Sequence, residues 1–401
     1  MCKKIFLFFC FFYLSFFVKG ICSQHKSKDS KILKFGMSTV LTGPNASIGK
    51  EFSFGVKALF AKINKKGGIH GKKLKLIVLD DGYDPKRTIK NMYKLIKKEK
   101  VLGIIGNVGT PTGVVAMPIA IQNKILFFAP FTGAQALRPN PPNRYVFHYR
   151  ASYYEEIKCL LDGIFKYTNI KPDEVAFFTQ KDAYGDEIFK AGIKVLKKYG
   201  FKKEVIHVRY LRNTLYVKEA AAMLLRINPP PKVIVLGGTY SACSKFIKIL
   251  RKYGFKGIFV SVSFIGSEAL ASIAKKDPLA GEGVIISQVV PFFNENLPLI
   301  KQYLKDISSF KPGKKPTLIS LEGYIAADIL VKALRKIKGE ITRESIIDAL
   351  EGLGRFDIGI GVPLKLSPKD HQASHYVWIT IIKNGKLMPF DFKEFSYEMV
   401  N

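Results

Sequence analysis

The sequence lacks the short motifs by which many enzymes are identified. It contains no nucleophile elbow, no phosphate loop with Gly-Lys-Ser/Thr and no His-Glu-x-x-His. Adjacent Asp80 and Asp81 would face opposite sides of a strand, which makes them a poor acid–base pair. His371 and His375 have no third metal ligand at a diagnostic spacing, and a polar surface loop is the favoured interpretation. We therefore expect no enzyme activity, no metal and no cofactor.

Cysteine is also scarce, with 5 in 401 residues. Cys2, Cys10 and Cys22 fall within or at the end of the first apolar segment, which leaves Cys159 and Cys243. Each of these two lies on a helix-like apolar stretch, so we expect buried single thiols. A disulfide between them stays open as the alternative, because the compartment inferred below permits one.

Long apolar runs are missing after the first segment. Lys3 and Lys4 precede an apolar stretch from Ile5 to Val18, and small residues follow. This order predicts a secretory signal peptide over residues 1–22 and a mature protein in the periplasm. A lipid anchor at Cys22 fits the residues around it poorly.

Basic residues outnumber acidic ones by 64 to 32, which gives a formal charge of +32. Such a balance would suit a nucleic-acid partner. The lysines are spread along nearly every predicted helix, however, and no recognition motif accompanies them. We expect a solvated basic surface and no nucleic-acid partner.

The apolar pattern predicts an α/β fold, because short apolar strands alternate with amphipathic helices in two successive runs. In the first run, Asp84 is expected to cap a helix that Pro85 begins. A polar, proline-rich loop over 138–144 interrupts the rhythm, and the chain is expected to cross to a second domain near Arg150. The last strands are expected over 362–366 and 376–382. A C-terminal tail over 384–401 follows, which begins with a turn at Asn384-Gly385 and is otherwise unpatterned.

Two loops in the first run have the composition of a binding site. Gly106–Gly109 follows an apolar strand and leads to Thr110, expected at the N-cap, and Pro111, expected as the first helical residue. A second strand leads into a loop over 129–133 that carries Thr132. Ligands of parallel α/β sheets bind beyond the carboxyl ends of the strands. The hydroxyls, free amides and helix N-terminus there suit a carboxylate, although a pair of ordinary turns is an equally simple reading.

Strand ends in the second run carry aromatic residues with polar tips. Tyr184 and Tyr240 follow two different strands and suit a pocket that stacks on a ligand and binds its head group. Packing at a domain rim would explain them equally well.

The segments together resemble the type I periplasmic solute-binding proteins of the leucine/isoleucine/valine-binding class. The matching motifs occur in family order over 34–383: Leu41-Thr-Gly-Pro44, Gly67-Gly-Ile-His-Gly71, Leu79-Asp-Asp-Gly-Tyr-Asp-Pro85, Ile105-Gly-Asn-Val-Gly-Thr110, Ala129-Pro-Phe-Thr-Gly133 and Asp182-Ala-Tyr-Gly185. The resemblance implies two doubly wound parallel-sheet lobes joined by a three-stranded hinge. Lobe 1 would comprise 34–150 plus 291–361 and lobe 2 would comprise 151–290 plus 362–383. The chain would cross near 150, 289–291 and 361–363.

The resemblance also implies the function. A monomeric, extracytoplasmic protein would capture a small organic ligand between its lobes and deliver it to a membrane ABC permease. A ligand-sensing subunit for a receptor or kinase is the main alternative, and an extracytoplasmic enzyme is a weaker one. The residues implied to contact the ligand come from both lobes and are Thr110, Pro111, Thr112, Phe131, Thr132, Gly133, Tyr153, Tyr184, Tyr240 and Ser263.

Three departures from the family pattern bear on the ligand. Ser263 stands where the family has the acid that pairs with the ligand's ammonium, Gly133 replaces a hydroxyl residue, and Tyr83 and Gly109 replace a cysteine pair. A buried, unpaired ammonium is costly. Free leucine, isoleucine and valine are therefore expected to bind weakly, and an acid or amide with an aromatic or aliphatic body to bind better, unless another acid such as Glu322 substitutes.

Overall fold

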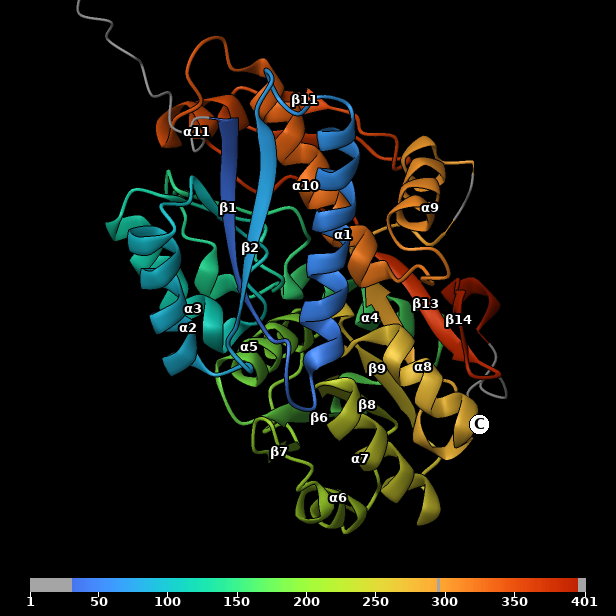
Figure 1. The fold of residues 1–401 in the computed structure, drawn as a ribbon. Coiled ribbons are helices and arrows are strands. Elements are labelled where there is room, and N and C mark those ends of the chain that lie inside the picture. The colour runs from blue at the N-terminus through green and yellow to red at the C-terminus, as the bar shows by residue number, and fades with distance from the viewer. Residues whose placement is uncertain (1–30, 294–295, 396–401) are drawn as a thin grey trace, which may run out of the picture.

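The computed structural model describes residues 31–293 and 296–395, and the expected signal peptide, with Cys22, lies outside them. The described chain forms two α/β lobes (Figure 1). No helix in these ranges is long and apolar enough to cross a membrane. Cys159 and Cys243 are free thiols, the second of them buried.

Lobe 1 is built on a five-stranded parallel sheet in the order β2-β1-β3-β4-β5. Its strands are β1 (Ile32–Thr39), β2 (Lys73–Asp80), β3 (Gly103–Ile105), β4 (Leu126–Phe128) and β5 (Val146–Phe147). Its helices are α1 (Ala46–Lys65), α2 (Pro85–Tyr93), α3 (Thr110–Gln122), α9 (Pro298–Phe310), α10 (Leu318–Lys336) and α11 (Arg343–Glu351). The π-helical turn η2 (Lys94–Lys98) extends α2.

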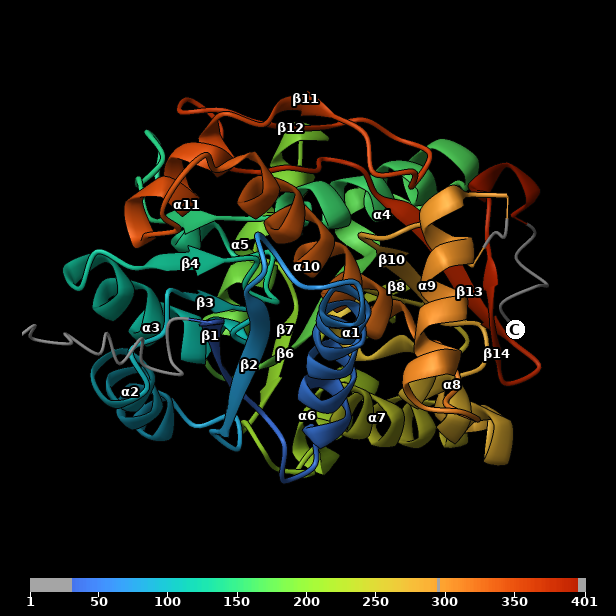
Figure 2. The ribbon, with the colours of Figure 1, turned by 45° about the horizontal axis from the view of Figure 1, so that its top comes forward.

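Local chemistry accounts for several of these elements. The Asp84 side chain accepts hydrogen bonds from the backbone N–H groups of Lys86 and Arg87, and Pro85 begins α2, as predicted. Helices α1 and α10 lie side by side (Figure 2). A Cβ at Gly55 would lie 1.8 Å from the carbonyl oxygen of Ser320, so glycine permits this close crossing.

Lobe 2 is built on a seven-stranded sheet in the order β14-β13-β10-β9-β8-β6-β7. Its parallel strands are β6 (Val175–Gln180), β7 (His207–Tyr210), β8 (Val233–Gly237), β9 (Ile258–Ser261) and β10 (Ile285–Gln288). Its helices are α4 (Tyr153–Tyr167), α5 (Ala183–Lys198), α6 (Lys218–Leu225), α7 (Tyr240–Lys252) and α8 (Ser267–Lys276).

Two antiparallel strands, β13 (Trp378–Lys383) and β14 (Lys386–Pro389), complete the edge of this sheet. The turn expected at Asn384-Gly385 is present, but the expectation of an unpatterned tail directly after it is wrong. The turn at Asn384 and Gly385 closes a β-hairpin, and the chain continues as a sheet strand up to Pro389. Beyond 395 the prediction lies outside the described residues.

Three connections cross between the lobes. The first follows β5 and the second follows β10; the Tyr149 hydroxyl donates to the Val289 carbonyl at 2.9 Å and joins them. The third was expected near 361–363 but lies further along. The short strands β11 (Gly354–Phe356) and β12 (Leu364–Leu366) pair with each other, and His148 pairs with Gln372 beside lobe 1. The chain enters the lobe 2 sheet only at Trp378.

Candidate functional site

The two polar loops of lobe 1 meet at the carboxyl ends of β3 and β4. These strands are neighbours in the sheet, and the loops continue the pairing through a bridge between Val108 and Phe131. The bridge brings the hydroxyl oxygens of Thr110 and Thr132 to 2.7 Å from each other, fully buried. The predicted juxtaposition of these loops is thus present in the fold.

Thr110 does not cap α3, contrary to the prediction. Gly109 occupies the N-cap position with φ of 100°, and no side chain caps the helix. The Thr110 hydroxyl instead pairs with Thr132. The Thr112 hydroxyl donates to backbone carbonyls of its own loop, Val108 and Gly109, and Pro111 is buried beside it.

Gly133 allows lobe 2 to dock on this loop. The backbone N–H of Tyr153, the first residue of α4, donates to the Gly133 carbonyl at 2.7 Å. A Cβ at Gly133 would lie 2.6 Å from the Tyr153 nitrogen. The position therefore serves a close backbone approach rather than a hydroxyl contact.

Aromatic rings from both lobes fill the seam between them. Phe264, in the single turn η5 (Ser263–Ile265) of lobe 2, lies at the centre. Its ring centroid is 5.5 Å from that of Phe131, 6.2 Å from that of Tyr83 and 4.6 Å from that of Tyr184. Tyr153 adds a fifth ring, 5.6 Å from Tyr184. All five are buried, so the lobes meet in a closed arrangement around an apolar centre.

Polar contacts at the rim also join the lobes. The Asn45 amide donates to the Asn213 side chain at 3.1 Å, and Asn213 donates to the Gly82 carbonyl. Tyr240 lies at this rim rather than among the five rings. It is only partly buried, and a Cβ at Gly266 would lie 2.9 Å from its ring.

Arg150 is the functional candidate that the sequence reasoning missed. Its guanidinium is 1% exposed and lies 4.3 Å from the Phe131 ring centroid. Its Nε donates to Glu322 at 2.9 Å, and its Nη2 donates to Glu322 at 3.1 Å and to the Ser263 hydroxyl at 2.7 Å. Sequence reasoning used Arg150 only to mark a crossing. An acid, Glu322, within the apolar first half of α10 was the signal that a buried cation lies opposite.

Burial and this ion pair shift both pKa values. Burial would lower the pKa of Arg150, but the Glu322 carboxylate outweighs it and raises the pKa above its ordinary value. Burial raises the pKa of Glu322 to about 7, against the pull of Arg150. Burial likewise raises the pKa of Glu156, whose Oε2 accepts from the Ser263 amide and the Ser287 hydroxyl, both at 2.8 Å.

Three buried polar atoms at the seam have no hydrogen-bond partner. They are Arg150 Nη1, the Tyr153 hydroxyl and Glu156 Oε1. Buried polar groups are normally paired. The seam therefore offers a small polar ligand one N–H donor, one hydroxyl that can donate or accept, and one carboxyl oxygen.

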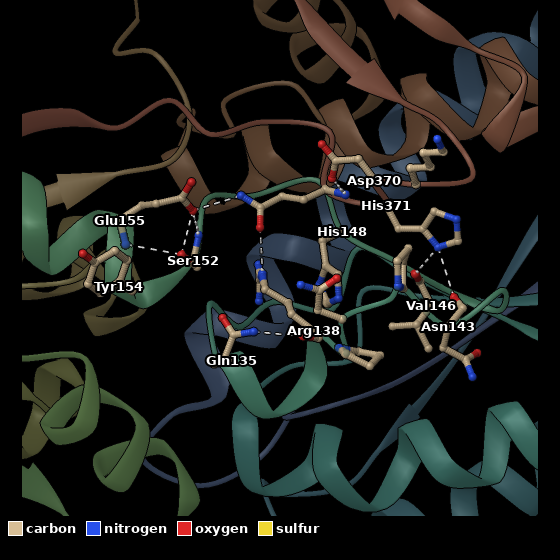
Figure 3. Close-up of a pocket in the computed structure, with 15 residues that line it drawn as sticks. Gln135, Arg138, Asn143, Val146, His148, Ser152, Tyr154, Glu155, Asp370 and His371 are labelled. Carbon is tan, nitrogen blue, oxygen red and sulfur yellow. Dashed lines mark hydrogen bonds between the residues drawn. The ribbon is translucent and has the colours of Figure 1, made fainter. Parts of the chain in front are cut away.

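A separate pocket of about 340 Å³ lies on the hinge side, and none of the ten predicted site residues lines it (Figure 3). Most of its polar side chains bond to one another, although His148 Nδ1 and the Tyr154 hydroxyl are buried without a hydrogen-bond partner. Arg138 donates to Gln372 at 3.1 Å, Gln372 donates to Glu155 at 2.9 Å, and Glu155 accepts from Ser152. His371 is hydrogen-bonded to the backbone of the 143–146 loop. The pocket is a hinge feature, and the seam is the better candidate for the ligand.

The ion pair of His375 with Glu155, beside the hinge pocket, should make the stability of the fold depend on pH. The pKa of His375 is raised above 6.5 by its hydrogen bond to Glu155, 2.6 Å away. Burial would raise the pKa of Glu155, but hydrogen bonds from His375 and Ser152 lower it to about 2. The His375 contribution is therefore complete below about pH 6.5 and disappears as pH rises through the raised pKa. The Glu155 contribution is complete above about pH 4.5 and is lost as pH falls to about 2.

We expect His375→Gln to remove a pH-dependent stabilisation of about 0.5–1 kcal/mol, which is small because the His375 side chain is 56% exposed. Urea unfolding between pH 5.5 and 8.5 measures it. The exposed His70, in the loop between α1 and β2, gives the control His70→Gln. Equal pH profiles for the wild type and His375→Gln would contradict the pairing.

Comparisons with known proteins bear on the family and the fold of this chain. The periplasmic binding protein family model matches residues 32–386. The Leu/Ile/Val-binding protein homolog 2 of Brucella abortus (strain 2308) is 27% identical over 60% of this chain, and the match spans 62% of that protein's length.

Solved structures have the same fold. A possible leucine/isoleucine/valine-binding protein from Rhodopirellula baltica SH 1 is 44% identical, with a TM-score of 0.87 over 92% of this chain and 99% of that one. A fatty acid ABC transporter substrate-binding protein from Thermomonospora curvata shares the fold at 22% identity, with a TM-score of 0.78 over 92% of this chain and 95% of that one. These similarities confirm the predicted two-lobe α/β class.

Proposed function

Because this chain belongs to the periplasmic binding protein family, we propose that it captures a small organic ligand between its lobes and delivers it to an ABC importer. Members of this family are substrate-binding proteins rather than enzymes. The ligand class comprises amino-acid-like molecules, organic acids and amides. Delivery requires the mature protein to leave the cytoplasm, in line with the signal peptide expected over residues 1–22.

The observation that carries the proposal is the buried polar and aromatic seam between the lobes. One face supplies the paired hydroxyls of Thr110 and Thr132, and the other supplies Tyr184 and Phe264. A ligand that touches both faces binds the closed state better than the open state and so shifts the equilibrium toward closure. The three crossing segments are the only places, within the described chain, where the backbone passes between lobes, which suits a hinge motion.

Ligand capture and delivery are tested in sequence. The protein without residues 1–22 is screened by thermal shift against amino acids, dicarboxylates, aromatic acids and short amides. A ligand at a hundredfold excess over its Kd should stabilise the protein by about 2.7 kcal/mol. The loaded protein is then added to the importer of the same organism in proteoliposomes, where ligand-dependent ATP hydrolysis is expected. Stimulation of a receptor or kinase instead would favour the sensing role, and turnover of the ligand would indicate an enzyme.

Removal of the Thr110 hydroxyl should weaken ligand binding. Thr110→Val keeps the shape of the side chain, so we expect a loss of about 1–2 kcal/mol, the value of one hydrogen bond to a charged group. Isothermal titration with the ligand from the screen measures the change in Kd. Thr380→Val removes a buried hydroxyl in the lobe 2 sheet and should leave Kd unchanged. Equal Kd values for Thr110→Val and the wild type would show that the loop does not contact the ligand.

A further inference from the structure

We infer that Arg150 anchors the ligand through a carboxylate, and that the ligand is an acid with an apolar body and no ammonium group. This inference rests on the proposed function and narrows its ligand class. The Arg150 guanidinium lies against the Phe131 ring of the lobe 1 loop and donates to the Ser263 hydroxyl of lobe 2. Arg150 therefore occupies the point where both faces of the predicted site meet.

The hydrogen-bonding capacity of Arg150 is incompletely used. Its Nε and Nη2 serve Glu322 and Ser263, whereas Nη1 is buried with no partner. A guanidinium presents its donors in a planar fork that matches a carboxylate. The Tyr153 hydroxyl is a second buried group without a hydrogen-bond partner, and the Arg150 charge acts on it. A carboxylate could accept from both groups, whereas an ammonium could not pair with the Arg150 guanidinium, which has no acceptor.

The charges around the seam point the same way. Four buried ionisable side chains influence one another there: Arg138, Arg150, Glu156 and Glu322. Arg150 donates to both oxygens of Glu322, so an ammonium that paired with Glu322 would have to lie beside the Arg150 cation.

Glu156 provides the one argument for an amine, because its Oε1 is unpaired. Its other oxygen is held by the backbone N–H of Ser263, and the Ser263 hydroxyl receives a hydrogen bond from Arg150. A ligand ammonium placed near Glu156 would therefore lie close to the Arg150 cation and be repelled by it. The geometry favours the acid over the amine.

The aromatic rings define the rest of the ligand. Phe131 and Tyr83 belong to lobe 1, whereas Phe264 and Tyr184 belong to lobe 2, so opening of the hinge separates two apolar faces. An aliphatic or aromatic body placed between them would be buried on closure. A branched-chain or aromatic monocarboxylate has both the anionic group for Arg150 and the apolar body for the rings.

The test compares leucine with 4-methylpentanoate, which has the same carbon skeleton and carboxylate but no amine, and with 4-methylpentanamide, which lacks the charge. Phenylacetate represents an aromatic acid. Isothermal titration of the wild type should show that at least one acid binds about tenfold or more tightly than both leucine and the amide. Binding of leucine but neither acid would overturn the inference and leave the proposed function standing. No binding by any compound in this set and in the wider screen would count against both.

Variants then assign the effect to Arg150. Arg150→Met with Glu322→Leu removes both charges of the ion pair together, so neither partner is left behind as an unpaired buried charge. Acid affinity should fall about 30-fold in this double variant, the scale of a hydrogen bond between charged groups, and circular dichroism should show a folded protein. Arg144→Met removes an arginine whose carboxylate partners lie on α11, outside the seam, and should bind like the wild type. Unchanged acid affinity in the folded double variant would exclude Arg150 as the anchor.

Discussion

Glu322→Gln is expected to lower the free energy of unfolding by about 3–5 kcal/mol, the usual result of removing one partner of a buried ion pair. Arg150 and Glu322 are 1% and 4% exposed. Water therefore cannot solvate the Arg150 cation once the Glu322 charge is removed. The substitution keeps the size of the side chain, so the loss arises from electrostatics rather than from a cavity. The glutamine side chain also places an NH2 donor where a carboxylate oxygen accepted a hydrogen bond from Arg150.

Urea unfolding at pH 7.5 measures this loss. Glu344→Gln is the matched control, because Glu344 pairs with Arg144 at the surface, where both side chains are more than 40% exposed. An exposed pair contributes about 0–1 kcal/mol. A loss for Glu322→Gln as small as that of the control would mean that the Arg150 charge is solvated or paired elsewhere.

Gly133→Ala is expected to weaken ligand binding by about tenfold or more and to destabilise the fold by about 1–3 kcal/mol. The new methyl group would lie 2.6 Å from the backbone nitrogen of Tyr153 and 2.5 Å from its ring. A backbone atom at the start of α4 cannot move aside as a flexible side chain can. The first turn of α4 must therefore shift away from lobe 1, and the two faces of the seam lose their fit.

Gly113→Ala serves as the control for this substitution. It lies inside α3, where alanine is favoured over glycine, and its new methyl group would meet mainly the end of the flexible Leu137 side chain. Titration and urea unfolding of both variants separate the two effects. Gly133→Ala with the affinity and stability of the wild type would show that the lobes do not dock through this loop.

Much of the fold follows from local patterns. Strands and helices alternate with the spacing of a parallel α/β sheet, and the cap at Asp84 with Pro85 marks the start of α2. The meeting of Thr110 and Thr132 was predictable for the same reason, because loops at the carboxyl ends of neighbouring parallel strands must lie together.

The centre of the site was not predictable in this way. Arg150 and Glu322 are 172 positions apart, and no periodicity connects a residue at a domain crossing with an acid in a helix of another segment. The third crossing was misplaced because backbone hydrogen bonds of His148 with His371 and Ala373 hold the chain beside lobe 1. Such isolated contacts depend on tertiary packing and leave no repeating pattern in the sequence.

The most direct test of capture in the seam is a crystal structure of the protein with the tightest-binding compound from the screen. We expect the ligand to lie between Phe131 and Phe264, with a carboxylate oxygen about 3 Å from Arg150 Nη1. A ligand in the hinge pocket of Figure 3, or one whose amine contacts Glu156 while Arg150 Nη1 stays unpaired, would contradict it.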